Sequence, residues 1–476
     1  MAFNSIEFLY FLLIAVGVHQ LCRPSLRLPW LLACSYYFYA QWNHIYLWLI
    51  VLSTFIDYTC AIYIEKQKPW AKFWLGVSLC SNLGMLFFFK YYGFFSEIVL
   101  DLTTLLNRPF YTPILNVLLP VGISFYTFQT MSYSIDVYRG KIKAEKHFIK
   151  FAVYVASFPQ LVAGPIERAS HLLPQMDRIY RINTSDAVSG LRLIGWGLFK
   201  KVVVADRLSA YVEYVLSDHS QPHSIQVFLA GFWAIVVLYA DFSGYADIAI
   251  GSARMVGLHL RDNFNFPYFS RSIQDFWKRW HMSLHSWFLD YVYFPLGGSR
   301  VPWSRLMMNI AIVFLLSGLW HGASWNFVIW AMLHAVFVVF HMHFMKVCKF
   351  FNIDFGEGFF VRLFGSLMVQ AQWAFSMYFF FVDEVHRSLY LLKCLVTSPL
   401  SLEGVKLFPF PPFVVLLCFF ATFCLYWGEW MHLRKAWPER LAQMSLGRRW
   451  ACYYVIIFTI MIIGVETQNP FIYFQF

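Results

Sequence analysis

His321 is the side chain in this sequence with the clearest capacity for chemistry. It lies in residues 315–322, inside an apolar stretch, where a titratable imidazole is costly and usually faces a cavity or a partner rather than lipid. Gly318 and Gly322 remove side-chain bulk beside the ring and leave room for another group to approach it. Because burial disfavours the charged imidazolium, we expect His321 to be neutral at pH 7 and able to accept a proton from a hydroxyl. A structural histidine that hydrogen-bonds a neighbouring helix is the alternative.

Two further segments carry polar side chains. Asp241 and Asp247 place two carboxylates in what we interpret as a break near a helix end, and interhelical hydrogen bonding is favoured over direct catalysis for them. Residues 271–293 combine aromatic and charged side chains, so they predict an amphipathic helix at the membrane interface. His281 and His285 are four residues apart and would share a face of that helix, but no third ligand is apparent and no metal is predicted.

The composition indicates the surroundings in which these side chains must work. Hydrophobic residues make up 59% of the chain, charged residues make up 13%, and the mean hydropathy is +0.55, whereas a soluble domain carries about 25% charged residues. Long apolar runs recur along the chain, so we predict an all-α polytopic membrane protein with roughly a dozen transmembrane or re-entrant helices. The clearest predicted spans are residues 46–62, 73–89, 225–239, 307–320, 328–341, 363–382 and 413–426.

Two segments interrupt this pattern of simple spans. Residues 158–168 hold Gly164 and Pro165 in apolar surroundings, and residues 119–126 form a similar break. Proline cannot donate a backbone hydrogen bond, and irregular backbone persists at membrane depth mainly where protein or a water-filled cavity satisfies it. We therefore expect neighbouring protein or a cavity to satisfy both segments.

Charge gives the expected orientation. The net charge of +11 is interpreted as positive loops at the cytoplasmic surface, and no nucleic-acid partner is predicted. The most basic connection, residues 433–449, is expected on the cytoplasmic side. Residues 450–465 are then the last crossing, and residues 466–476 emerge on the outer side. The nine cysteines are scattered without a CxxC pair, so they predict neither a metal site nor a disulfide framework.

The sequence around these candidates resembles a known family. Residues 274–284 (QDFWKRWHMSL), 291–298 (YVYFPLGG) and 318–323 (GLWHGA) are similar to motifs of the membrane-bound O-acyltransferase family. Residues 122–129, 163–166, 200–201 and 241–245 fit the same pattern. The resemblance is greatest to the bacterial branch of alginate and peptidoglycan O-acetyltransferase membrane subunits, with the teichoic-acid D-alanyl transferase as a relative. It runs from the N-terminal region through at least His334 and includes the tail.

This resemblance implies a helical core around a central funnel or tunnel, with His321 as the catalytic histidine in the membrane. His281 is implied as the second family histidine, which could orient the acceptor or hydrogen-bond the developing oxyanion. The candidate tunnel or supporting residues are Trp320, Gly322, Asp241, Ser243, Tyr245, Gly164 and Pro165. Lys278 and Arg279 are candidates for attracting the phosphates of an acyl donor, with anchoring at the interface as the alternative.

The chain is thus expected to hold a membrane domain over residues 1–449, with its core motifs in residues 119–335. Residues 450–476 are expected to form the final helix and an aromatic tail. Residues 471–476 (FIYFQF) resemble an aromatic C-terminal motif of this branch, in which Tyr473 is the candidate acyl acceptor. A phenol, with a pKa of about 10, lies near a thiol at about 8.5, so a tyrosyl ester would retain much of the transfer potential of a thioester. An aromatic anchor at the membrane interface is the alternative.

The predicted function is that of an O-acyltransferase, expected to transfer acetyl, in the bacterial inner membrane. It would move the acyl group from a cytosolic thioester such as acetyl-CoA toward a cell-envelope or exported polysaccharide, of peptidoglycan or alginate type. No bound cofactor is predicted, and the expected partner is a periplasmic acyltransferase resembling SGNH hydrolases. Two alternatives stay open: D-alanyl transfer to teichoic acid, and a polytopic transporter or flippase that uses His321 in a proton relay.

Overall fold

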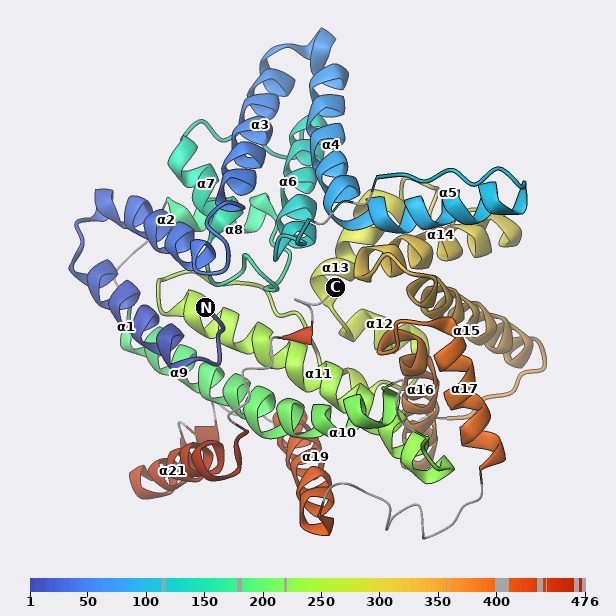
Figure 1. Ribbon diagram of the computed structural model, residues 1–476. Helices are drawn as coiled ribbons and strands as arrows, with labels where there is room; N and C mark the ends of the chain where they lie inside the picture. Colours follow the sequence, from blue (N-terminus) through green and yellow to red (C-terminus); the bar gives the residue numbers. More distant parts are fainter. Residues whose placement is uncertain are drawn as a thin grey trace. The chain divides into compact units, whose positions relative to one another are not determined.

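The computed structural model describes residues 1–113, 115, 117–177, 182–217, 221–356, 358–398, 411–434, 440–441, 443–465 and 471–472. Within those ranges the regular secondary structure is helical throughout (Figure 1). The predicted all-α class is therefore confirmed. The chain divides into two compact units. Unit 1 comprises Met1–Leu191 and Ala249–Arg261, and unit 2 comprises Arg192–Ile248 and Asp262–Phe476.

Seven helical stretches of the described residues are long and apolar enough to cross a membrane. They are Leu47–Lys66, Lys68–Leu105, Ser224–Arg254, Trp303–His321, Trp325–Phe350, Pro412–Leu433 and Leu446–Ile463. Six of the predicted spans and the predicted last crossing coincide with these stretches. The predicted span at residues 363–382 forms helix α16, Phe359–Phe380, which is not among the seven.

Unit 1 contains the helices of the first part of the chain. They are α1 (Ile6–Leu21), α2 (Pro24–Ala40), α3 (Leu47–Lys66), η1 (Lys68–Trp70), α4 (Ala71–Leu86), η2 (Phe87–Tyr91), α5 (Tyr92–Leu105), α6 (Ile123–Tyr138), α7 (Phe148–Ala156) and α8 (Ala169–Met176). Helices α3, α4 and α6 pack side by side (Figure 1).

A fully buried carboxylate ties these three helices together. Asp57 on α3 accepts hydrogen bonds from Asn82 Nδ2 on α4 at 3.0 and 2.9 Å, one to each carboxylate oxygen. The Ser78 hydroxyl on α4 donates to Asp57 Oδ1 at 2.5 Å, and the Thr130 hydroxyl on α6 donates to Asn82 Oδ1 at 3.1 Å. Because a buried carboxylate is costly without such donors, this network fixes the way the three helices pack.

The predicted break at residues 158–168 is confirmed. Helix α7 ends at Ala156, and the chain runs through buried turns until α8 begins. The Phe158 N–H donates to Ser35 Oγ at 3.1 Å, and the Gln160 side-chain amide donates to the Tyr154 carbonyl at 2.7 Å. Protein groups thus supply the hydrogen bonds that irregular backbone needs away from water.

The predicted break at residues 119–126 is also confirmed, since α6 begins only after Gly122. Gly122 adopts a left-handed conformation with φ of 75°, and a Cβ there would lie 2.6 Å from the carbonyl oxygen of Leu161. Both the positive φ and the close approach require glycine at this position.

Unit 2 contains most of the remaining helices, and α9 and α11 cross the boundary between the units. These elements are α9 (Thr184–Leu198), η3 (Phe199–Ala205), α10 (Asp206–Leu216), α11 (Ser224–Arg254), η4 (Pro267–Phe269), α12 (Ile273–Arg279), α13 (Met282–Phe288), η5 (Leu289–Tyr293), α14 (Trp303–His321), α15 (Trp325–Phe350), α16, α17 (Val385–Thr397), α19 (Pro412–Arg434) and α21 (Leu446–Ile463).

The break predicted at Asp241 and Asp247 is wrong. Helix α11 runs without interruption for 31 residues through both carboxylates. They are accommodated because each has a lysine partner: Lys201 Nζ lies 2.6 Å from Asp241 Oδ1, and Lys200 Nζ lies 2.8 Å from Asp247 Oδ2. The lysines offset the cost of removing the two carboxylates from water, so α11 can carry both within its length.

The single amphipathic helix predicted for residues 271–293 is also wrong. Helix α12 ends at Arg279, α13 begins at Met282, and the last part widens into the π-helix η5. Phe276 and Trp280, which we expected at a membrane interface, are 0% and 2% exposed. Phe276, Trp280, Trp287 and Phe288 are therefore packed inside the protein, and the interruption of the helix falls at His281.

Candidate active site

His321 is the last residue of α14 and is buried in unit 2. Its imidazole lies among aromatic rings, with ring centroids 4.9 Å from Trp320, 5.1 Å from Trp330 and 5.6 Å from Phe380, each meeting it edge-on. Trp330 belongs to α15 and Phe380 to α16, so three helices enclose the ring. This enclosure limits the ring orientation and shields the ring from bulk water, which strengthens electrostatic interactions at this position.

Two glycines bring α14 and α15 into close contact at this histidine. A Cβ on Gly318 would lie 2.5 Å from the Phe327 carbonyl oxygen and 2.6 Å from the Ala331 Cβ. A Cβ on Gly322 would lie 2.0 Å from Cε2 of Phe327. Favourable contacts between such atoms are about 3.5–4.0 Å, so neither position has space for a side chain. The room that the sequence predicts beside His321 is filled by α15.

His281 sits at the junction between α12 and α13 in a left-handed backbone conformation, with φ of 42°. This conformation is uncommon for a residue other than glycine and is often found at functional sites. Two backbone hydrogen bonds hold it: Met282 N–H donates to the Asn263 carbonyl at 2.8 Å, and Asn265 N–H donates to the Arg279 carbonyl at 2.9 Å. The segment before η4 therefore fixes the kink on both sides of the histidine.

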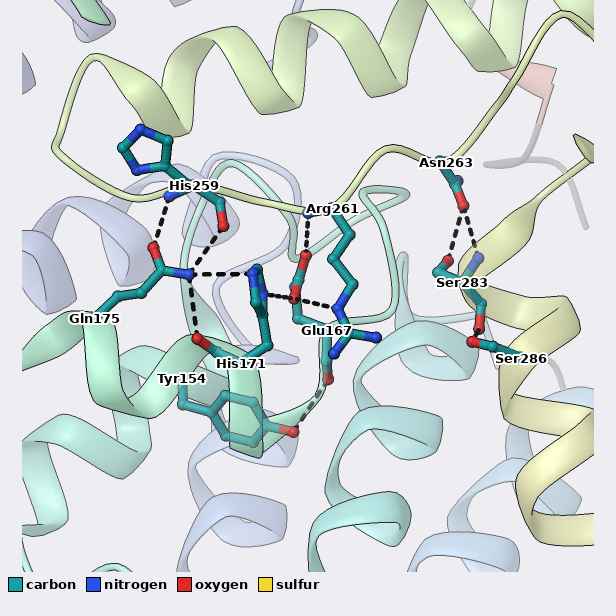
Figure 2. A network of polar contacts seen from close by, with 9 residues as sticks. All are labelled: Tyr154, Glu167, His171, Gln175, His259, Arg261, Asn263, Ser283 and Ser286. Carbon is teal, nitrogen blue, oxygen red and sulfur yellow. Dashed lines mark hydrogen bonds and ion pairs between the residues drawn. The ribbon is translucent and has the colours of Figure 1, made fainter.

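The side chain of Asn263 determines which imidazole nitrogen of His281 carries the proton. Asn263 Oδ1 lies 3.1 Å from His281 Nδ1. The same oxygen accepts hydrogen bonds from the Ser283 hydroxyl at 2.8 Å and the Ser283 backbone N–H at 3.3 Å (Figure 2). A backbone N–H can only donate, which identifies the amide oxygen in this position. The hydrogen of neutral His281 is therefore on Nδ1, and Nε2 carries the lone pair. Burial lowers the pKa of His281 to about 3, so the ring is neutral at pH 7.

One indole connects the two histidines. The Trp320 ring lies 5.6 Å from the His281 ring and 4.9 Å from the His321 ring. The Phe242 ring on α11 lies 4.7 Å from His281 on another side. The structure therefore brings His321, His281 and Trp320 together, and it adds α11 to the elements that position them.

The other α11 candidates form a buried charged cluster. Asp241 pairs with Lys201 of η3 as described above, and the Lys200 ammonium donates to Ser243 Oγ at 2.9 Å. The ring of Tyr245 meets the ring of Phe471, in the described part of the tail, at 4.7 Å. These contacts place Asp241 and Tyr245 next to the C-terminal segment.

Lys278 and Arg279 are in different surroundings. Lys278 is exposed, whereas Arg279 Nε donates to Asp275 Oδ1 at 2.9 Å on the same helix. Ser272 caps the start of α12, because its hydroxyl accepts a hydrogen bond from the Asp275 N–H at 3.1 Å. Of the two basic residues, Lys278 is therefore the one whose charge has no ion-pair partner among the described residues.

Gly164 and Pro165 belong to unit 1, in the buried turns between α7 and α8. Close to them in the sequence, the buried Glu167 accepts a hydrogen bond from the Arg261 backbone N–H at 2.6 Å through Oε1 (Figure 2). Its Oε2 lies 2.8 Å from His171 Nδ1 (Figure 2). These contacts attach the predicted break to the loop that follows α11, within unit 1.

Tyr473 lies outside the described residues. Two residues that matter for the local geometry, Asn263 and Glu167, were not singled out from the sequence. No local signal marks Asn263, because its partner His281 is 18 residues away and the kink that joins them is not predictable from periodicity.

These features define a class of protein. The chain is a multi-pass helical membrane protein, and its unit 2 buries two imidazoles against one tryptophan. Such an arrangement is suited to proton transfer at a site that is shielded from water. Residues 141–391, more than half of the chain, match the membrane-bound O-acyltransferase (MBOAT) family. The chain belongs to this family, and it is an O-acyltransferase.

Curated relatives agree with this assignment. The probable alginate O-acetylase of Azotobacter vinelandii is 38% identical over 346 residues, which are 71% of this chain and 68% of the relative. The peptidoglycan O-acetyltransferase of Helicobacter pylori is 36% identical over 380 residues, 74% of this chain and 70% of the relative. The teichoic acid D-alanyltransferase of Bacillus subtilis is 27% identical over 235 residues, 48% of this chain and 60% of the relative.

Proposed function

We propose that this chain transfers an acetyl group from a cytosolic thioester, such as acetyl-CoA, toward a polysaccharide outside the bacterial inner membrane. The observation that carries the proposal is the placement of two buried imidazoles on one indole, His281 and His321 on Trp320, in a chain of the O-acyltransferase family. Acetyl is favoured over D-alanyl because the O-acetylating relatives match the chain at higher identity and over a greater length than the D-alanyl transferase does.

In the proposed reaction His321 is the general base. It removes the proton of an attacking hydroxyl, whose oxygen forms a bond to the carbonyl carbon of the thioester. The carbon–sulfur bond then breaks, and the leaving thiolate takes up the proton from His321, which returns the imidazole to its neutral form. The products are an O-acetyl ester and a free thiol, so the histidine is unchanged at the end of the cycle.

His281 then orients the hydroxyl rather than stabilising the oxyanion. In the tautomer held by Asn263, its Nε2 carries a lone pair and can accept a hydrogen bond from a hydroxyl. It cannot donate one through Nε2 while it is neutral, and its pKa of about 3 keeps it neutral at physiological pH. Of the two roles that the resemblance allows, orientation of the acceptor is therefore favoured.

We further propose that the Tyr473 hydroxyl is the first acceptor and that a periplasmic acyltransferase, resembling SGNH hydrolases, passes the acetyl group to the polysaccharide. Support comes from the described part of the tail, since Tyr245 of α11 contacts Phe471 and Phe242 of the same turn contacts His281. The proposed acceptor polymer is of peptidoglycan or alginate type, as the names of the two O-acetylating relatives indicate.

The proposal is tested with inside-out vesicles that contain the purified protein. Isotopically labelled acetyl-CoA is added, and the C-terminal peptide is analysed by mass spectrometry. We expect a labelled acetyl group on Tyr473 in the wild type and none in His321→Ala. His343→Ala is the matched control, because that histidine is exposed near the end of α15. Acetylation that persists in His321→Ala would reject the general base, and transfer to the exported acceptor that is unchanged in Tyr473→Phe would reject the relay.

A further inference from the structure

Unit 2 buries a cluster of three charged side chains that the proposed chemistry does not use. Lys201 of η3 lies between Asp241 of α11 and Asp206, the first residue of α10, with its Nζ 2.6 and 2.8 Å from their Oδ1 atoms. All three residues are at most 3% exposed. Removing a charged group from water costs roughly several kcal/mol of free energy for each ion. Two carboxylates around one ammonium therefore contribute little net stability to the fold. Such a cluster calls for a further role.

The C-terminal tail supplies that role through its main chain. The Ile472 backbone N–H donates to Asp241 Oδ2 at 2.8 Å, while Asp241 Oδ1 is held by Lys201. The Lys201 ammonium lies 4.4 Å from the centroid of the Phe471 ring, which Tyr245 meets from another side at 4.7 Å. Phe471 is 1% exposed. The lysine therefore both aims the carboxylate at the tail and contacts the tail itself.

A second contact holds the start of the tail on the same π-helix. The Val465 N–H donates to the Val202 carbonyl of η3 at 3.2 Å, and the Arg207 guanidinium donates to the carbonyl of Ile463. π-Helical turns often occur at functional sites, because the wider turn leaves carbonyl groups available for other partners. Adjacent residues of η3, Lys201 and Val202, thus contact the chain at two points after α21, at residue 465 and at residues 471–472.

We propose that Lys201 and Asp241 form an anchor for the C-terminal segment and thereby position Tyr473, the next residue in the chain, for acetyl transfer. This inference rests on the proposed function, because it gives the tail an acceptor role. Lys201 and Asp241 are positioning residues, since the groups they bind belong to residues 471 and 472. The anchor uses the Ile472 backbone N–H and the Phe471 ring, and neither group takes part in the proposed acetyl transfer.

The sharpest test removes the bound hydrogen without altering the buried cluster. Ile472→Pro lacks the N–H that Asp241 accepts, whereas Ile472→Ala keeps it and sets the reference for the loss of the side chain alone. A hydrogen bond to a charged group changes an equilibrium constant, here that of tail binding, by a factor of about 10 to 100. We expect the initial rate of labelled acetyl transfer to Tyr473 in Ile472→Pro to fall by about that factor below the rate of Ile472→Ala. Equal rates in the two variants would overturn the anchor.

A second measurement separates failure of the anchor from failure of the proposed relay. Amide hydrogen exchange of the C-terminal peptide reports tail binding without any acyl transfer. We expect slow exchange of the Ile472 N–H in the wild type and fast exchange in Asp241→Asn, with thermal unfolding used to confirm that the variant is folded. Fast exchange in the wild type would overturn the anchor. If Tyr473→Phe leaves acetyl transfer to the exported acceptor unchanged, the proposed relay is rejected. The hydrogen-exchange result alone then decides whether the tail is anchored.

Discussion

Gly318→Ala should disable the enzyme without touching a reacting group. The added Cβ would lie 2.5 Å from the Phe327 carbonyl oxygen, a backbone atom that cannot rotate away. Restoring a normal contact of about 3.5 Å requires α14 and α15 to separate by about 1 Å. The end of α14 would move with Gly318, because Gly322 N–H donates to its carbonyl at 3.0 Å and His321 lies between the two.

The magnitude follows from these distances. Overpacking of this kind costs about 1–3 kcal/mol of stability. A displacement of about 1 Å at a reacting group costs about 100-fold in rate, so activity should fall far more than stability suggests. Gly195→Ala is the matched control, because a Cβ on this glycine of α9 would meet no atom within 4 Å, and alanine is favoured over glycine in a helix by about 1 kcal/mol.

Two quantities are measured. The thermal midpoint in detergent is determined by fluorescence-detected size-exclusion chromatography, and the rate of acetyl transfer is determined in vesicles. We expect Gly318→Ala to lower both and Gly195→Ala to lower neither. A Gly318→Ala protein with a wild-type rate would show that the close approach of α14 and α15 does not set the position of His321, and it would refute the reasoning.

Three further predictions concern buried polar groups. Asn263→Leu should lower the rate of acetyl transfer about tenfold, since the hydrogen bond that holds the His281 tautomer is lost. Asn263→Asp should keep more activity, and its negative charge should raise the pKa of His281. Transfer rates measured against pH would show the loss in the first variant and the pKa change in the second. Asp57→Leu should lower stability by about 2–5 kcal/mol, because Asn82 and Ser78 lose their acceptor, and Asp57→Asn should cost less; the thermal midpoints of the two variants decide. The pKa of His281 falls from the ordinary 6.5 to about 3 on folding, so between pH 6.5 and pH 3 the unfolded chain binds a proton that the folded chain does not. Stability should therefore decline by up to about 1.4 kcal/mol per pH unit as the pH falls through this range. A His281→Asn variant with the same decline would contradict this prediction.

The helical class and most of the spans are predictable from this sequence, because membrane-spanning helices need long apolar runs and the runs are visible. The two confirmed breaks, at residues 119–126 and 158–168, are also predictable, since proline and glycine act through local backbone geometry. The break predicted at Asp241 and Asp247 is wrong because the contacts that matter there are long-range rather than local. What allows α11 to continue is a pair of lysines about 40 residues earlier, and such long-range partners leave no local mark.

The same distinction applies to the candidate site. His321 and His281 can be selected from their types and surroundings, and the structure places both on Trp320. The kink at His281 could not be predicted, because the aromatic periodicity of residues 271–293 fits one helix. The observed turn depends on two long-range backbone hydrogen bonds, one accepted by the Asn263 carbonyl and one donated by the Asn265 N–H. Local composition therefore selected the two candidate histidines, and tertiary contacts decide their geometry.

The left-handed backbone at His281 affects how its role should be measured. Asparagine and glycine occupy such a conformation more readily than alanine does, so His281→Ala would add backbone strain to the loss of the imidazole. An alanine scan would then overstate the contribution of this side chain to turnover. Replacement by asparagine changes the side chain with the least disturbance of the turn, and it is the substitution from which a rate deficit at this position can be attributed to the ring.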